Sequence, residues 1–222
     1  MIPVYLLLAE SVIEEEREMI LRAARELPAV FPGCEVRVAG DRSRVRYAVP
    51  DVEAVLEKVP VEDGKRDASL LMRLLVADTR RLDPAGIWLL FLGDDLRLSS
   101  LRLSWCFGAA STGKRVSVQS FARFRGLTEE ERFFCLRRTL RHEIGHMCGM
   151  AADRNRAGVV EDHGPHCSRP GCSMRQTGTL EKLLAARAQE EGREDCFCPD
   201  CRADYRRFVK KTEEMKKKGL SH

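Results

Sequence analysis

The sequence predicts an α/β fold, a mixed and twisted sheet flanked by helices, followed by a smaller C-terminal lobe. Two observations carry this prediction. Apolar runs typical of strands alternate with helical segments through the first half of the chain, and the region after residue 149 is loop-rich with clustered cysteines. The 222 residues suffice for one domain with a core of ordinary size. We therefore expect a single domain with an N-terminal lobe (1–149) and a C-terminal lobe (150–222).

Strands and helices alternate in the first part of the chain. The apolar residues 1–9 predict a buried strand, and Ser11 to Glu14 form a capping-box pattern that predicts a helix to about Leu27. The elements expected next are a strand at 34–39, irregular chain at 41–63, a helix at 68–77, a strand at 86–92 and shorter strands near 104–107 and 115–121. This order indicates a mixed sheet with helices on its faces.

The second half begins with a clearly delimited helix. Thr128 to Glu131 form another capping box and Gly149 supplies a stop, so we expect a helix at about 129–148. Residues 150–178 show no period, which predicts loops. A modest helix at 179–191 and a charged helix from 202 to about 218 follow, and the lysines of the last helix suit a solvated helix end.

Composition restricts the classes of function. Hydrophobic residues make up 44% of the chain and charged residues 32%, with a net charge of +4 and 6% aromatic residues, so neither disorder nor nucleic-acid binding is indicated. No apolar run approaches the ~18 residues of a membrane span, and the apolar N-terminus lacks the basic flank of a signal peptide. We expect a cytoplasmic, monomeric protein that contacts neither nucleic acid nor membrane.

The nine cysteines need an explanation. In a reducing compartment, clustered cysteines more often bind metal than form disulfides. Five of them lie between Cys167 and Cys201. The other four are expected to be free, mostly buried thiols: Cys34, Cys106, Cys135 and Cys148.

The strongest local signal is the HExxH segment from His142 to His146. Residues four apart lie on one face of a helix, so both imidazoles can bind one metal ion. Glu143 lies beside them, placed to take a proton from a metal-bound water whose pKa zinc lowers toward ~7. We expect the histidines to line a cleft or to face whatever lobe covers that side, because an apolar stripe occupies nearly the opposite side of the helix: Phe133, Leu136, Leu140, Ile144 and Met147.

Downstream residues extend this pattern. Gly149 follows the second histidine by three residues, and His166-Cys167, Cys172, Met174 and the C-x-x-C pair Cys198 and Cys201 come after it in that order. In these motifs the sequence resembles the archaemetzincin family, whose members carry H-E-x-x-H-x-x-G-x-x-H-C-x-x-x-x-C-x-M followed by C-x-x-C. The segments 105–109 and 116–118 also resemble the family, and the likeness is dense over about 85–208.

The resemblance implies a metzincin-like fold and a zinc-dependent peptidase that acts on a peptide or protein. It assigns His142, His146 and His166 to a catalytic zinc, with Glu143 as general base and Met174 as the Met-turn residue beneath the metal. A second, structural zinc is assigned to Cys167, Cys172, Cys198 and Cys201. The chemistry agrees, because four thiolates make a closed tetrahedral site, whereas three histidines leave one position open for water. Substrates of such enzymes commonly lie extended along an edge strand.

The chain departs from the family pattern at the third histidine. The expected position is Ala152, which cannot bind metal. Fourteen inserted residues would bring His166 into place, and we favour it because it directly precedes the first clustered cysteine. His163 is the runner-up and Asp153 the third candidate. The inserted segment, 150–165, could act as a lid over the cleft or could abolish activity.

Two functions stay open on these grounds. The first is the peptidase, and the second is a catalytically weak or inactive zinc-stabilised binding module. A purely structural site has no need of a carboxylate beside the first histidine, so Glu143 favours the peptidase, whereas Ala152 favours the module. Cys196 is a further alternative, because it could replace Cys198 as a ligand, although the tight turn of a C-x-x-C pair favours Cys198.

Overall fold

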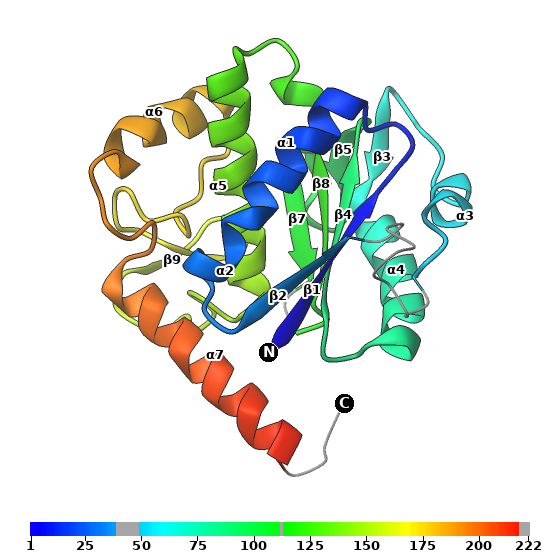
Figure 1. Cartoon of the computed structure of the whole chain (residues 1–222). Coiled ribbons are helices and arrows are strands. Elements are labelled where there is room, and N and C mark those ends of the chain that lie inside the picture. Colours follow the sequence, from blue (N-terminus) through cyan, green and yellow to red (C-terminus); the bar gives the residue numbers. More distant parts are fainter. Residues whose placement is uncertain (39–48, 112, 218–222) are drawn as a thin grey trace.

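A five-stranded sheet forms the centre of the molecule (Figure 1). The structure is a computed structural model and describes residues 1–38, 49–111 and 113–217. The strand order is β2-β1-β4-β8-β7, with parallel pairing except between β7 and β8, which are antiparallel. The sheet is therefore mixed, as predicted, and β7 is one of its edges. The strands are β1 (Ile2–Leu8), β2 (Cys34–Val38), β4 (Ile87–Leu92), β7 (Gly108–Ser111) and β8 (Val116–Ser120).

Helices cover both faces of this sheet. On β1, Val4 and Leu6 share a core with α1 and α5, whereas Tyr5 and Leu7 share the other core with α3 and α4. Because both faces are buried, β1 and β4 are continuous apolar runs and not alternating patterns. The helices are α1 (Glu14–Arg25), the short α2 (Leu27–Val30), α3 (Val52–Glu57), α4 (Ala68–Leu82) and α5 (Glu129–Met147).

A three-stranded sheet adjoins the β7 edge. Its order is β3 (Lys65–Asp67), β5 (Asp95–Leu98) and β6 (Leu103–Cys106). A single residue, Phe107, connects β6 to β7, so the two sheets meet at this edge. Of the strands in this region the sequence predicts β6 and misses β3, β5 and β7, because strands of three or four residues are too short to show a hydrophobic period.

The termini of α5 are those that the sequence predicts. Thr128 is the N-cap, where its hydroxyl accepts a hydrogen bond from the Glu131 amide (3.4 Å) and the Glu131 carboxylate accepts one from the Thr128 amide (3.0 Å). At the other end Gly149 adopts a φ of +72° and donates to the His146 carbonyl (3.0 Å), while the next amide donates to Gly145 (2.9 Å). This Schellman motif ends the helix at Met147, directly after the HExxH segment.

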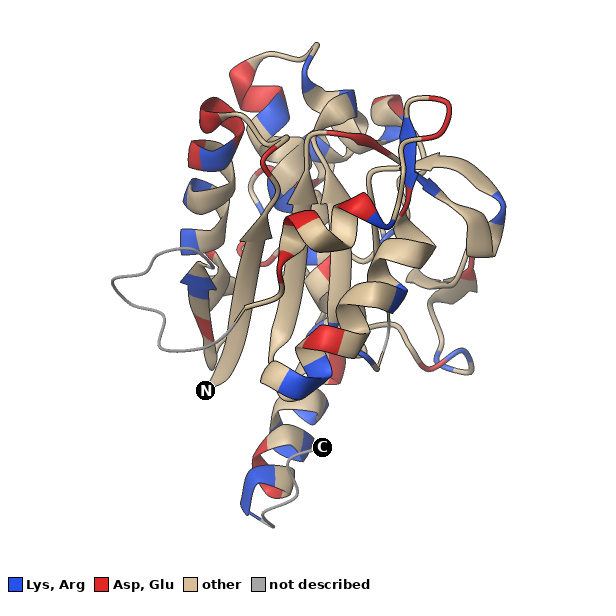
Figure 2. Ribbon diagram, turned by 90° about the vertical axis from the view of Figure 1, so that its right-hand side faces the viewer, with Lys and Arg blue, Asp and Glu red and all other residues tan. Residues whose placement is uncertain are grey.

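The segment after α5 contains a hairpin, which corrects the prediction of loops at 150–178. Its strands β9 (Val159–Glu161) and β10 (Pro165–Cys167) pair antiparallel, and His166 lies opposite Val160. α6 (Leu180–Glu190) and α7 (Pro199–Lys217) follow. Figure 2 shows both signs of charge interspersed over the helices, including α7. Within the described ranges, no helix has the length and apolar character needed to cross a membrane.

Several predicted boundaries are wrong. Ser11 does not cap α1, because its hydroxyl accepts a hydrogen bond from the Gly93 amide (3.0 Å) and the helix begins only at Glu14. The stretch 41–63, expected to be irregular, contains α3, and α4 extends past the predicted 68–77. Some predicted positions lie outside the described residues: Ala39, 41–48 and Lys218.

Candidate functional site

A cleft of about 410 Å³ opens between α5, the β6–β7 edge and the tip of the β9–β10 hairpin. His142, Glu143 and His146 line it from α5. The sheet edge contributes residues 103–110 and the hairpin contributes residues 163–166. The predicted apolar stripe of α5 is buried in the core on another side of the helix, so the HExxH face is directed at the cleft.

Three imidazoles converge in this cleft. The Nε2 atom of His146 lies 3.0 Å from that of His142 and 3.1 Å from that of His166. The Nδ1 atom of His142 lies 2.7 Å from the Ser173 carbonyl, and that of His166 lies 2.9 Å from the Gly164 carbonyl. Because a carbonyl only accepts, each Nδ1 carries the proton, and Nε2 keeps a free lone pair directed at the centre of the group.

These nitrogens fit one tetrahedral metal ion. Three nitrogens at the usual ~2.0–2.1 Å from zinc lie ~3.3 Å apart, close to the spacing of the three histidines. Burial lowers the pKa of all three rings, that of His146 to about 3, so they are neutral as ligands must be. Without a cation, the lone pairs of His142 and His166 would both face the Nε2 atom of His146, which can donate at most one hydrogen bond.

The hairpin brings His166 to the HExxH histidines, whereas His163, which also lines the cleft, and Asp153 are not part of this group. The His163 ring is about half exposed, and its Nε2 lies 3.9 Å from an Asp162 carboxylate oxygen. Asp153 is exposed and accepts a hydrogen bond from the Asn155 amide (3.0 Å). The antiparallel strands β9 and β10 carry the chain out and back between Ala152 and His166.

Glu143 is buried beside the three histidines. Its side chain lines the same cleft, and burial raises the pKa of its carboxyl to about 8. Gly108 on β7 makes room for it, because a Cβ atom there would lie 3.2 Å from the Glu143 Oε1 and 3.2 Å from the Gln119 side chain. The amide atoms of Gln119 are buried without a hydrogen-bond partner in the described part of the chain. Sequence reasoning missed Gly108 and Gln119, whose proximity to Glu143 depends on strand pairing.

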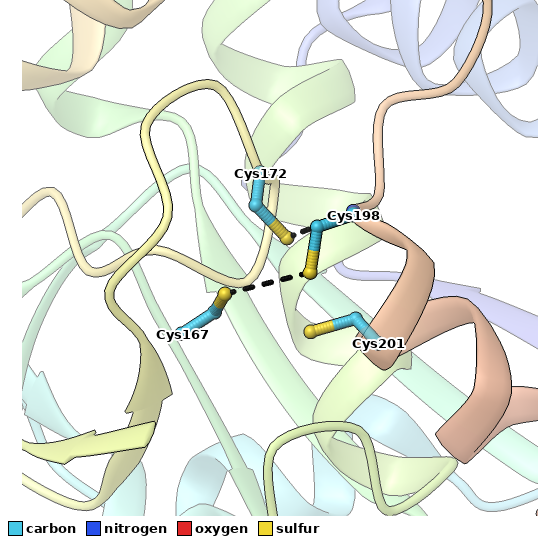
Figure 3. Close-up of side chains that lie close together, drawn as sticks. All are labelled: Cys167, Cys172, Cys198 and Cys201. Atoms are coloured by element: carbon cyan, nitrogen blue, oxygen red, sulfur yellow. Dashed lines mark hydrogen bonds between the residues drawn. The ribbon is translucent and has the colours of Figure 1, made fainter. Parts of the chain in front are cut away.

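Four cysteine sulfurs form a second cluster (Figure 3). The Sγ atoms of Cys167, Cys172, Cys198 and Cys201 all lie within 4.8 Å of one another. The Cys167 and Cys198 sulfurs are 3.7 Å apart, and the Cys198 amide donates to the Cys172 sulfur (3.4 Å). Four sulfurs at ~2.3 Å from one tetrahedral ion lie ~3.8 Å apart, so the cluster fits a structural zinc.

The thiols of this cluster cannot all be ionised without a cation. Hydrogen bonds from the Cys172 and Cys201 thiols lower the pKa of Cys167, and in turn the pKa of those two thiols is raised. Cys196 is not part of the cluster, and burial raises the pKa of its thiol. All nine cysteines are free thiols, so the disulfide alternative does not apply in this structure.

Comparison with known proteins identifies the fold. No family model and no curated protein matches the sequence. Among solved structures, archaemetzincin from Methanopyrus kandleri has a TM-score of 0.66 at 19% identity, covering 94% of this chain and 96% of that one. Archaemetzincin from Archaeoglobus fulgidus, complexed with malonate, has a TM-score of 0.60 at 22% identity, covering 91% and 99%. A zinc-dependent peptidase from Methanocorpusculum labreanum has a TM-score of 0.59 at 19% identity, covering 92% and 100%.

The chain has the archaemetzincin fold. The metzincin-like arrangement predicted from the sequence motifs is thereby confirmed, over more of the chain than the motifs themselves cover. Within this fold Met174 is fully buried beneath the HExxH turn of α5. Gly145 permits that approach, because a Cβ atom there would lie 2.2 Å from the Met174 sulfur. The Met-turn role of Met174 stays a prediction, and the close packing of Gly145 against it was not predicted.

A buried ion pair connects helix α5 to the segment around the cysteines. Arg138, which is 2% exposed, pairs with Glu190 on α6 and donates a hydrogen bond to the Cys172 carbonyl (3.0 Å). Burial lowers the pKa of this guanidinium to about 10. It also lines the cleft one turn before His142. Sequence reasoning missed Arg138, since nothing local distinguishes it from the other arginines of the same helix.

Proposed function

We propose that this protein is a zinc-dependent peptidase with two zinc ions. One zinc would be held by His142, His146 and His166, and the other, structural, by the four clustered cysteines. The observation that carries the proposal is the position of Glu143, a buried carboxyl that shares a cleft with three converging imidazole nitrogens. A structural site needs no such carboxyl, whereas peptide hydrolysis does.

When bound at the three histidines, zinc supplies Lewis-acid polarisation of the scissile carbonyl and lowers the pKa of water. The positive charge of a bound zinc would favour the ionised form of Glu143, against the burial that raises the pKa of its carboxyl. The ionised carboxylate takes a proton from the attacking water, whose oxygen bonds to the carbonyl carbon. The carbon–nitrogen bond then breaks, and Glu143 passes the proton to the leaving amine. The products are one carboxylic acid and one amine, so the atoms of the single water molecule are accounted for.

The β7 edge offers a binding surface for the substrate backbone. β7 pairs with β8 on one side, and its other side adjoins the cleft at Gly108, Ala109 and Ala110. An extended peptide can add to such an edge through main-chain hydrogen bonds. Its scissile carbonyl would then lie near Glu143, because a Cβ atom on Gly108 would come within 3.2 Å of the Glu143 Oε1 atom.

The test compares the wild type with Glu143→Gln on a mixture of quenched fluorescent peptides, with zinc content measured on the same samples. We expect the wild type to cleave peptides and the variant to lose roughly 10²–10⁴-fold in rate with unchanged zinc content. Glu130→Gln, an exposed carboxylate on the same helix, serves as the matched control and should keep full activity. A zinc-loaded wild type that cleaves no peptide would instead support the binding-module alternative.

A further inference from the structure

The inserted segment 150–165 is fastened to the four-cysteine cluster by one arginine. The side chain of Arg156 is 14% exposed, and its Nη2 atom donates to the Cys201 sulfur (3.5 Å). The same guanidinium lies 3.2 Å from an Asp204 carboxylate oxygen and 3.5 Å from one of Asp200. All three partners belong to the first part of α7, so Arg156 joins the insertion to that helix.

Hydrogen bonds also fix the segment near its start, at Ala151, and at Gly158. The Ala151 amide donates to the Asp204 carboxylate (2.9 Å), the same group that Arg156 contacts. After the hairpin, the Ser168 amide and hydroxyl both donate to the Gly158 carbonyl (2.9 and 3.1 Å). The first half of the segment is therefore fixed at Ala151, Arg156 and Gly158, and the hairpin continues from this fixed part.

The charge of a zinc–thiolate centre gives this contact a chemical role. Four thiolates and one zinc ion carry a net charge of −2, and burying such a charge is costly unless nearby groups compensate it. Arg156 supplies a positive charge and an N–H···S hydrogen bond at Cys201. Its Nε and Nη1 atoms are buried without a hydrogen-bond partner in the described residues, so the guanidinium keeps donor capacity beside the cluster.

We infer that segment 150–165 is a fixed strap across the four-cysteine site, and that Arg156 is the positioning residue that stabilises the metal–thiolate centre through Cys201. This inference rests on the proposed zinc at the cysteines and is independent of peptidase activity. The strap is followed directly by His166 and Cys167. The side chain of His166 belongs to the histidine cluster and that of Cys167 to the cysteine cluster. Holding the strap therefore also holds the cleft wall that residues 163–166 form.

The test uses full-length protein loaded with Co²⁺, whose sulfur-to-metal charge-transfer absorption reports on the thiolate site. Arg156→Met removes the charge and the hydrogen bond at similar length, and Arg156→Lys restores the charge. Arg154→Met is the matched control, because Arg154 lies in the same segment with its side chain 68% exposed. The release of cobalt to a chelator is followed at this absorption band.

We expect release from Arg156→Met to be about 10–100-fold faster than from the wild type, as for other groups that support metal ligands. Its charge-transfer band should move to longer wavelength, because the sulfur loses a hydrogen bond. Arg156→Lys should recover part of the difference and remains informative if the Met variant does not fold, while Arg154→Met should match the wild type. Wild-type release rate and band position in Arg156→Met, or an Arg156→Lys variant that releases cobalt no more slowly than Arg156→Met, would overturn the inference. Absence of any thiolate band in the wild type would overturn the four-cysteine metal site itself.

Discussion

Gly145 and Met174 approach so closely that a Cβ atom on residue 145 would lie 2.2 Å from the Met174 sulfur. Met174 is fully buried, and the Met150 sulfur lies 3.3 Å from the same point, so the sulfur has little room to move. The glycine inside the HExxH segment therefore sets the distance between the metal-binding turn of α5 and the residue beneath it.

Gly145→Ala should displace Met174 and destabilise the fold by roughly 1–3 kcal/mol, the usual cost of overpacking a core. Urea unfolding of the zinc-loaded protein measures this change. Gly126→Ala is the control, because a Cβ atom at that glycine meets nothing within 4 Å. Equal stability of the two variants would mean that Met174 can rearrange freely.

The two neighbouring cysteines Cys196 and Cys198 should differ in their effect on metal content. Cys198→Ser removes one of the four clustered sulfurs, so we expect it to lose about one zinc per chain at chelator concentrations that the wild type withstands. Cys196→Ser should retain the wild-type content, because that thiol lies outside the cluster. Elemental analysis after dialysis decides between them, and a loss of zinc confined to Cys196→Ser would make Cys196 the ligand.

Arg138 and Glu190 form a pair whose single disruption should be costly. Arg138→Met would leave the Glu190 carboxylate, 8% exposed, without its partner, and we expect a loss of about 3–5 kcal/mol in unfolding free energy. Adding Glu190→Gln should recover a large part of that loss. Arg137→Met, whose ion pair with Glu26 is partly exposed and 3.7 Å long, should cost about 1 kcal/mol or less. A small effect of Arg138→Met alone would show that the pair is not a structural tie.

The sequence predicted those parts of the fold that short-range patterns determine, such as apolar runs and helix caps. The apolar runs of β1 and β4, the capping box at Thr128 and the glycine stop at Gly149 all lie where the pattern indicates. Ser11 shows the limit, because the same capping pattern was outcompeted by a hydrogen bond to Gly93, a residue distant in sequence. Strands of three or four residues, such as those of the hairpin, have no period to detect.

In the candidate site, too, the sequence predicted the residues with a local pattern and missed those defined by tertiary contacts. His142, Glu143 and His146 follow from helical spacing, and His166 follows from its adjacency to a clustered cysteine. The residues that shape the site through tertiary contact, including Gly108 and Arg138, could not be predicted, because their neighbours come from strands and helices far away in the sequence. The spacing of the ligands in the sequence does not show which backbone segments or which buried charges pack around the site.

The zinc content of the purified protein, compared with His166→Ala and His163→Ala, tests the central claim most directly. In the structure the Nε2 atom of His166 lies 3.1 Å from that of His146, whereas the His163 ring is about half exposed at the hairpin turn. We predict two zinc ions per chain in the wild type and in His163→Ala, and one in His166→Ala. A wild type that holds one zinc, unaffected by either substitution, would contradict the account of a catalytic metal completed by the inserted hairpin.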